Sequence, residues 1–175
     1  MEIKIIQQEN AGDILLPNDP FPLCGKLHPS YINGRWNYTM EHFPDSKITE
    51  MCFPNENYNF HQMHQNSIFI GAYDNGICVG LGILQHYWFR YIYLYDLKVS
   101  KSHRNKGIAT AIMEKAKQIA AEQRYKGIYT VAQDNNLPAC QFYLKAGFHI
   151  GGLDTYVYQG TTQEGKADIL FYLDI

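Results

Sequence analysis

The chain has 175 residues, of which 46% are apolar and 18% are charged, and its 15 Lys and Arg against 17 Asp and Glu give a formal net charge of −2. This length and apolar content exclude an intrinsically disordered chain and predict a single domain over residues 1–175. The balanced charge argues against a basic nucleic-acid-binding protein, and no apolar run is long enough to span a membrane. Residues 1–6 lack the basic and then apolar order of a signal peptide, so we expect a cytoplasmic protein without nucleic-acid or membrane partners.

Neither the cysteines nor the histidines form a metal-binding pattern. No CxxC pair occurs, so we expect free thiols that pack mostly as small hydrophobic side chains: Cys24, Cys52, Cys78 and Cys140. His61 and His64 are close in sequence but have no third ligand nearby, and we interpret them as ordinary polar residues. We therefore predict no bound metal.

The amino-terminal part predicts one strand and one hairpin. Residues 3–6 are suited to a first strand. Residues 27–32 and 35–39 flank Asn33-Gly34, a pair that favours a type I′ turn between antiparallel strands. Residues 43–66 are rich in Asn, Pro, His and Met without a clear period, so we expect an irregular or partly helical insert there.

A second hairpin is predicted next. Residues 67–73 and 77–87 have strand character and are joined by an Asp-Asn-Gly turn over residues 74–76. Gly80 and Gly82 interrupt the second of these strands, which indicates a bulge or a close backbone approach.

The following segment predicts a strand that leads into a long helix. Residues 91–99 are apolar and rich in aromatic side chains, as expected of a strand. The apolar period then changes to that of a helix, with one stripe that contains Ile108, Ala109, Ile112, Met113, Ala116, Ile119 and Ala120.

The last third predicts a strand, a short helix and a closing hairpin. Residues 127–132 form the strand, and residues 138–146 form a helix that ends at Gly147. Residues 148–158 and 167–173 are expected to pair as antiparallel strands. The element order predicts an α+β fold, in which helices flank a mixed, mostly antiparallel twisted sheet.

The turn between the strand at residues 91–99 and the long helix is a candidate anion site. The first amides of a helix have no partner inside the helix and carry the positive end of its dipole. Gly107 lets a ligand come close to the backbone, and four nearby side chains add positive charge: Lys98, Lys101, Arg104 and Lys106. These features suit a phosphate or pyrophosphate, while an ordinary helix start with a solvated basic turn explains them equally well. Neither a P-loop nor a dinucleotide-binding glycine pattern is present.

Tyr143 is a candidate proton donor. It lies one turn after Ala139 on the short helix, near the end of the preceding strand, where its hydroxyl could protonate a leaving group. An aromatic core residue is the more common role of such a side chain, and both interpretations stay open at this point.

Two patterns together resemble the GNAT superfamily of acyl-CoA-dependent N-acyltransferases. They occur in order and are separated by a helix and a strand: Arg104-x-x-Gly107-x-Ala109 and Asn136-x-x-Ala139-x-x-x-Tyr143-x-x-x-Gly147-Phe148. Within that superfamily the chain is most similar to bacterial streptothricin acetyltransferases. The shared runs are 20–36, 95–96, 133–136 followed by 139–140, and 151–155.

The resemblance implies how acetyl-CoA would bind as co-substrate. Backbone groups of Leu97 and Val99 would hold the acetyl and pantetheine part, and Asn136, or less readily Asn135, would contact the pantetheine arm. Tyr143 would protonate the departing CoA thiolate. The pyrophosphate would be held by the backbone amides of Arg104, Asn105, Lys106, Gly107, Ile108, Ala109 and Thr110.

The acceptor side is less defined by the resemblance. Asp96 is the candidate base that takes the proton of the amine, and a carboxylate that only supports the sheet is an equal alternative. Tyr95 is a candidate substrate contact, but successive strand residues face opposite sides, so Tyr95 and Asp96 cannot both face the cleft without a bulge. Asp154 is a second candidate for contact with the substrate.

The sequence also departs from the streptothricin pattern. The stretch 57–66 has no carboxylate where those enzymes have an acidic run, and Val131 stands where a glutamate is expected. We therefore expect an N-acetyltransferase that acts on a small-molecule amine, either a streptothricin-like antibiotic or a smaller, more aromatic acceptor. A CoA-binding sensor without catalysis and a peptide or protein N-acetyltransferase are the alternatives, and a monomer and a homodimer are both compatible with the sequence.

Overall fold

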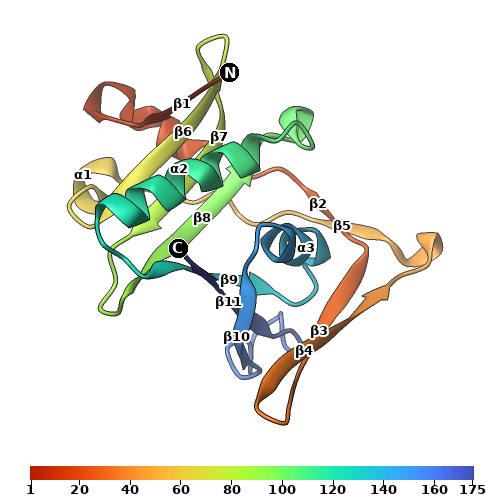
Figure 1. Cartoon of the computed structure of the whole chain (residues 1–175). Helices are drawn as coiled ribbons and strands as arrows, with labels where there is room; N and C mark the ends of the chain where they lie inside the picture. Colours follow the sequence, from red (N-terminus) through yellow and green to blue (C-terminus); the bar gives the residue numbers. More distant parts are fainter. The chain divides into compact units, whose positions relative to one another are not determined.

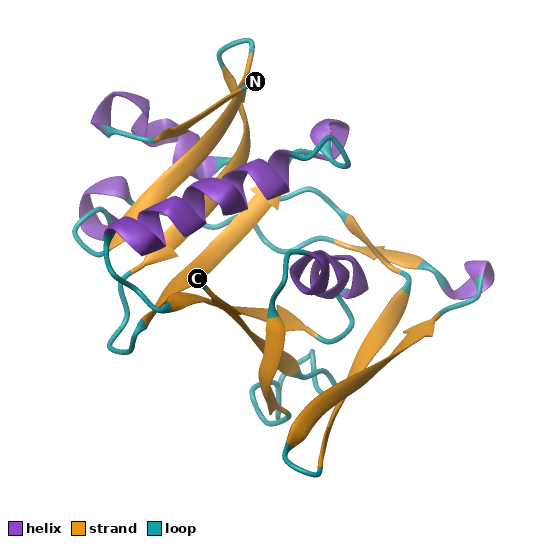
Figure 2. Ribbon diagram, in the orientation of Figure 1, coloured by secondary structure: helices purple, strands orange, loops and turns teal.

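A computed structural model describes all residues, 1–175, and the chain divides into two compact units. Unit 1 consists of residues 1–20, 52–128 and 175, and unit 2 consists of residues 21–51 and 129–174 (Figure 1). Each unit combines antiparallel strands with few helices (Figure 2). None of the helices has the length and apolar content that a membrane-spanning helix needs.

Unit 1 is built on four antiparallel strands. Their order in the sheet is β1 (Glu2–Ile5), β6 (Ser67–Asp74), β7 (Ile77–Gln85) and β8 (Tyr91–Val99). The predicted strands are confirmed, and the turn between β6 and β7 places Asn75 at φ 48° and Gly76 at φ 80°, as a type I′ turn requires.

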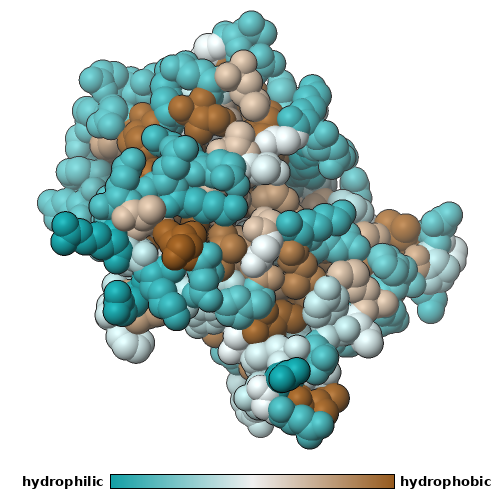
Figure 3. All heavy atoms as spheres, viewed as in Figure 1, coloured by the Kyte–Doolittle hydropathy of each residue, from teal (hydrophilic) through white to brown (hydrophobic).

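Helix α2 (Ile108–Glu122) packs across this sheet, as Figure 1 shows. The two glycines of β7 make room for it: a Cβ atom at Gly82 would lie 2.6 Å from Cγ2 of Ile112, and one at Gly80 would lie 2.9 Å from Cγ2 of Ile108. The close approach predicted from these glycines is confirmed, and the strand register also shifts opposite Gly80. Hydrophilic residues cover most of the outward face of α2 (Figure 3). The buried residues of the helix are Ile108, Ile112, Met113, Ala116, Ile119 and Ala120.

The opposite face of the unit 1 sheet carries a second core. The 3-10 helix η1 (Gln8–Leu15) and helix α1 (Phe60–Met63) contribute to it. Its buried residues are Ile6, Ile14, Phe69, Leu81 and Ile83, and Leu16, Tyr58, Phe60 and Met63 pack against them. The predicted insert at 43–66 is thus partly helical.

The two histidines of α1 make ordinary contacts. The His64 ring stacks on Phe60 with a centroid distance of 5.6 Å, and its Nδ1 lies 2.8 Å from the carbonyl oxygen of His61. No group of three or more His, Cys, Asp or Glu side chains in the chain is arranged to hold a metal ion.

Unit 2 contains three sets of strands. The hairpin of β3 (Gly25–Ile32) and β4 (Arg35–His42) confirms the Asn33-Gly34 turn, with φ angles of 52° and 75°. Strand β2 (Phe21–Leu23) pairs with β5 (Thr49–Met51), which follows the 3-10 helix η2 (Asp45–Lys47). Strand β5 lies in the segment that we expected to be irregular or partly helical. The third set has the order β9 (Gly127–Gln133), β11 (Asp168–Asp174) and β10 (His149–Asp154).

Helix α3 (Leu137–Lys145) covers one face of this third set. It begins one residue earlier than predicted because the Asn136 side chain caps it: Oδ1 accepts a hydrogen bond from the Ala139 amide at 3.3 Å. Gly147 follows the helix with φ 94°, as predicted.

Two further expectations need correction. Strand β10 ends at Asp154 rather than at Tyr158, because the Asp154 carboxylate accepts hydrogen bonds from the next backbone amides and closes a turn. All four cysteines are free, as predicted, but only Cys140 is buried and Cys52 is exposed, so the thiols are not mostly core residues.

Candidate functional site

The turn before α2 presents backbone amides that the helix does not use. Gly107 is the N-cap with φ 80° and ψ 5°, and no side chain caps the helix. The first helical hydrogen bond runs from the Ala111 amide to the Gly107 carbonyl at 2.9 Å. The amides of Ile108, Ala109 and Thr110 precede that bond and are therefore available to an anion. A Cβ atom at Gly107 would meet nothing within 4 Å, so the space beside the turn is open.

The positive charge around this turn is smaller than the sequence suggested. The Arg104 guanidinium donates to three carbonyl oxygens: Nε to Val99 at 3.1 Å, Nη1 to Pro20 at 2.6 Å and Nη2 to Asp19 at 3.0 Å. Arg104 therefore fastens the turn to residues 19–20 instead of offering its charge to a ligand. Lys101 and Lys106 are exposed beside the turn.

Backbone groups of Leu97 and Val99 lie on the side of β8 that faces away from β7. The Ser100 amide donates to the Val79 carbonyl oxygen at 2.9 Å, so Ser100 points toward β7. Because backbone groups alternate along a strand, those of Leu97 and Val99 point the other way. The bond from Arg104 to the Val99 carbonyl agrees with this direction. The Leu97 amide and carbonyl and the Val99 amide thus face the side where the resemblance implies the pantetheine arm.

A β-bulge brings Tyr95 and Asp96 to the same partner. Ile83 pairs with Asp96 and Leu84 pairs with Leu94, which leaves Tyr95 as the extra residue of β8. The Tyr58 hydroxyl donates to Oδ2 of Asp96 at 3.2 Å, and the Tyr58 and Tyr95 rings lie 6.0 Å apart. The bulge that was needed for both residues to share a face is therefore present.

Asp96 lies in an ion-pair cluster. Lys98 Nζ lies 3.1 Å from Asp96 Oδ2 and 2.7 Å from Glu56 Oε2, and Asn18 also donates to Glu56. Lys98 therefore does not contribute charge to the Gly107 turn. Burial raises the pKa of Asp96, with a further contribution from Glu56, while Lys98 and the Tyr58 hydroxyl act against this shift. For Glu56 burial also acts to raise the pKa, but hydrogen bonds from Lys98 and Asn18 outweigh it and the pKa is lowered.

These contacts suit both roles considered for Asp96. A buried carboxylate with a raised pKa is a better proton acceptor than an ordinary aspartate. A carboxylate held by a lysine and a tyrosine also stabilises the local fold.

In unit 2, Tyr143 is held by aromatic neighbours. Its ring centroid lies 5.3 Å from that of Phe148 and 5.5 Å from that of Phe171, and the residue is 7% exposed. The Asn136 oxygen is used as the helix cap, whereas Oδ1 of Asn135 is buried and accepts no hydrogen bond. Asn135, the less favoured candidate, thus has a buried side-chain oxygen without a hydrogen-bond partner.

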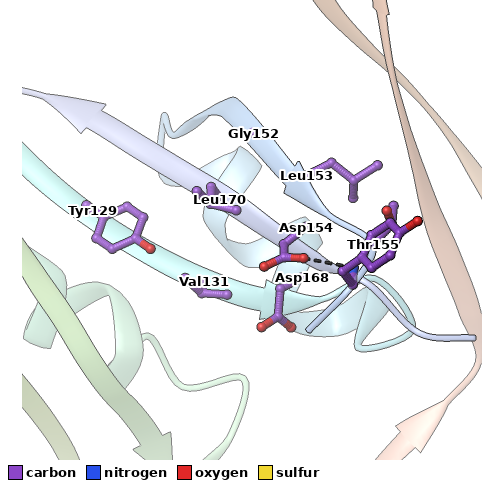
Figure 4. Close-up of a pocket in the computed structure, with 9 residues that line it drawn as sticks. Tyr129, Val131, Gly152, Leu153, Asp154, Thr155, Asp168 and Leu170 are labelled. Atoms are coloured by element: carbon purple, nitrogen blue, oxygen red, sulfur yellow. Dashed lines mark hydrogen bonds between the residues drawn. The ribbon is translucent and has the colours of Figure 1, made fainter. Parts of the chain in front are cut away.

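A pocket of about 540 Å³ lies on the face of β9, β11 and β10 that α3 does not cover (Figure 4). Residues of the α3 face, such as Thr130, Ile169 and Phe171, alternate along the strands with the pocket residues. The lining residues are Tyr129, Val131, Gly152, Leu153, Asp154, Thr155, Tyr156, Asp168 and Leu170.

Sequence reasoning missed three residues of these sites. Glu56 directly precedes the stretch that we described as free of carboxylates, and Tyr58 lies within it. Asp168 is the strand partner of Asp154 and lines the same pocket. The sequence could have indicated Asp168. It is a carboxylate at the start of the closing strand, and this strand was expected to pair with the strand that carries Asp154. Asp168 could therefore be expected beside Asp154.

Known proteins resemble this chain over most of its length. Residues 32–148 match the acetyltransferase (GNAT) family. The chain is 31% identical to streptothricin acetyltransferase A of Bacillus subtilis (strain 168) over 163 residues, which is 93% of this chain and 94% of that protein.

Solved structures show the same fold. A protein from Bacillus anthracis str. Ames, described as a streptothricin acetyltransferase and solved with acetyl coenzyme A, is 29% identical, with a TM-score of 0.87 over 99% of both chains. Nourseothricin acetyltransferase is 22% identical, with a TM-score of 0.80 over 99% of this chain and 97% of that one, and supports the fold alone. The chain belongs to the acetyltransferase (GNAT) family and is an acetyl-CoA-dependent acetyltransferase.

Proposed function

We propose that the chain transfers the acetyl group of acetyl-CoA to a primary amine of a small molecule, with a streptothricin-like antibiotic as one candidate acceptor. The observation that carries this proposal is the uncapped start of α2 at Gly107, in a chain whose relatives are named streptothricin acetyltransferases. Acetylation of such an antibiotic would give resistance to it.

The backbone of unit 1 would bind the coenzyme. The amides from Asn105 to Thr110 would receive the pyrophosphate, because the dipole and the unpaired amides of α2 favour an anion there. The Arg104 amide lies 3.4 Å from the Lys101 carbonyl oxygen and would contribute least. The Leu97 amide and carbonyl and the Val99 amide, which face away from β7, would hold the pantetheine arm, with Asn136 or Asn135 as its side-chain contact.

Two side chains would move protons. The attacking amine must be neutral, since an ammonium has no lone pair, and Asp96 would accept its proton directly or through a water. Tyr143 would donate a proton to the sulfur that leaves, because a protonated thiol is a better leaving group than a thiolate. The aromatic neighbours of Tyr143 fix its ring, which limits the positions that its hydroxyl can reach.

The acceptor would contact Tyr95 and Asp154. The missing acidic run at residues 57–66 argues against a cationic acceptor. Glu56 lies directly before this stretch and adds one negative charge near Asp96, which makes a cationic acceptor more favourable again.

Release of CoA thiol in the presence of acetyl-CoA and a panel of amines tests the proposal. We expect turnover with at least one amine, and a Tyr143→Phe variant that keeps its affinity for CoA but loses at least about tenfold in rate. Tyr31→Phe, on the exposed tip of the β3–β4 hairpin, is the matched control and should leave the rate unchanged. Binding of CoA without turnover of any amine would instead favour a CoA-binding sensor.

A further inference from the structure

A row of aromatic rings in unit 1 leads from the bulge of β8 to the turn between β7 and β8. The ring centroids of Tyr95 and Tyr93 lie 5.7 Å apart, and those of Tyr93 and Tyr87 lie 6.2 Å apart. Trp88 continues the row at 6.3 Å from Tyr87 and is 86% exposed. Tyr87 and Tyr95 are also exposed. We call these four residues the aromatic row.

The aromatic row lies on the same face of the sheet as the candidate base. Ile83 is the register partner of Asp96, and Gln85, two residues further along β7, is the partner of Tyr93. Register partners point to the same face of a sheet, and so do residues two apart in one strand. Tyr93 and Asp96 therefore share a face, and the ring contact with Tyr93 places the bulged Tyr95 there as well.

Tyr58 joins the aromatic row to the Asp96 carboxylate. Its hydroxyl donates to Oδ2 of Asp96 at 3.2 Å, and its ring centroid lies 6.0 Å from that of Tyr95. An acceptor amine at Asp96 leaves the rest of its molecule within reach of Tyr95 and Tyr93, because two steps along a strand span about 7 Å. One end of the row is therefore beside the proposed site of the reaction.

The exposure of these rings is more than the fold needs. Single aromatic side chains are common on protein surfaces, but rings that adjoin one another over a continuous exposed surface are typical of a binding site. Aromatic rings attract one another in offset or edge-to-face arrangements, so such a surface favours a flat aromatic group over a saturated one.

The charge along the row favours a neutral group. Residues 86–95 contain no Asp or Glu, and their one charged residue is Arg90. The ammonium of Lys126 lies 5.7 Å from the ring centroid of Tyr91 on the same strand. Negative charge is found only at the Asp96 end, which suits the ammonium form of the arriving amine. A second positive group of the acceptor on the row would meet like charges.

We propose that the aromatic row binds a neutral aromatic ring of the acceptor, which stacks on Tyr95 and Tyr93 while the acceptor amine lies at Asp96. This inference rests on the proposed function and names its substrate class. The preferred acceptor is a primary amine that carries an aromatic ring on a short alkyl linker. Tyr93 and Tyr95 determine this specificity and take no part in the proton transfers.

Matched acceptors test the inference. Values of kcat/KM are measured for phenylethylamine and for cyclohexylethylamine, its saturated counterpart, with wild type, Tyr95→Leu and Tyr93→Leu. Leucine keeps an apolar side chain but removes the ring, and thermal unfolding checks that each variant folds. Tyr38→Leu is the control, because Tyr38 lies on β4 of unit 2 and is 46% exposed, close to the 43% of Tyr95. The two amines differ in basicity, so the quantity compared is the change in their ratio between wild type and variant.

We expect the ratio of kcat/KM for the aromatic amine to that for the saturated amine to fall about fivefold in Tyr95→Leu and in Tyr93→Leu, which equals about 1 kcal/mol. The ratio should not change in the control. A row that only buries apolar surface would bind both amines equally well in wild type and variants. An unchanged ratio in either folded row variant would therefore overturn the inference.

Calorimetric titration of phenylethylamine into the protein saturated with CoA separates this inference from the proposed function. Binding that Tyr95→Leu weakens, without turnover of any amine, would support the aromatic row and overturn the acetyl transfer to amines. Absence of both turnover and binding would overturn both.

Sedimentation tests a second copy of the chain as the other occupant of the row. We expect wild type and Trp88→Ser to sediment alike. A dimer that Trp88→Ser dissociates would place a partner subunit on the aromatic row and overturn the inference.

Discussion

The ammonium group of Lys98 lies between two carboxylates, 2.7 Å from Oε2 of Glu56 and 3.1 Å from Oδ2 of Asp96. The Lys98 side chain is only 10% exposed, and that of Asp96 is 17% exposed. Lys98 is thus the one cation that these two carboxylates contact in the structure, and its removal leaves two partly buried negative charges side by side.

The change Lys98→Met should therefore destabilise the fold strongly. Breaking a buried pair by removing one partner costs about 3 kcal/mol, because the remaining charges are desolvated without compensation. Urea unfolding of the variant measures this loss. Lys117→Met, which removes the surface pair with Glu114, is the control and should change the free energy of unfolding by less than about 1 kcal/mol. Equal stability of the two variants would show that Lys98 is not an integral part of the cluster.

The stability of Asp168→Asn should depend on pH in a defined direction. The pKa of Asp168 is raised in the folded protein, so its ionised form is less favourable there than in the unfolded chain. The contribution of Asp168 to stability is fully present below its pKa in the unfolded chain, 3.8. It is lost as the pH rises through the higher pKa of Asp168 in the folded protein.

Asp168→Asn removes this loss, so the variant should melt at a higher temperature than wild type at pH 7 and show no such gain near pH 3. Melting curves across this range measure the difference. A variant that is less stable than wild type at pH 7 and equally stable near pH 3 would contradict the assigned direction.

The packing of α2 on β7 predicts a large effect of one methyl group. Gly82→Ala would place its Cβ 2.6 Å from Cγ2 of Ile112, which forces the helix or the strand to move. We expect a loss of about 2 kcal/mol in the free energy of unfolding. Gly12→Ala, where a Cβ meets nothing within 4 Å, is the matched control and should be nearly neutral. Chemical denaturation of both variants decides whether the glycine is needed for close packing.

Regular elements of this chain could be predicted from local pattern. Strand β8 has the predicted bounds, and the buried residues of α2 belong to the predicted stripe, because alternation and helical period depend only on nearby residues. The Asn-Gly turns were equally clear, since few other pairs adopt positive φ at two successive positions. Strand β5 was missed because three residues are too few to show alternation.

The candidate sites were harder to predict, because tertiary contacts place their side chains. The bulge at Tyr95 changes which residues of β8 share a face. From the sequence we could infer only that Tyr95 and Asp96 need a bulge in order to face the same side. We expected Lys98 and Arg104 to add positive charge at the anion site. Lys98 instead pairs with carboxylates, and Arg104 binds carbonyl oxygens. Their partners are 42 and 84 residues away in sequence, which no local pattern reveals.

Calorimetric titration of CoA into wild type, Gly107→Ala and Gly76→Ala tests the coenzyme site most directly. Both glycines have φ of 80° and open space beside them, so alanine causes the same backbone strain at either position. Only the alanine at Gly107 would put a methyl group where the pyrophosphate approaches the start of α2. We predict that Gly107→Ala weakens CoA binding at least about tenfold, equal to 1.4 kcal/mol, while Gly76→Ala binds like wild type. Unchanged CoA affinity in a folded Gly107→Ala variant, or no binding of CoA to wild type at millimolar concentration, would contradict the account.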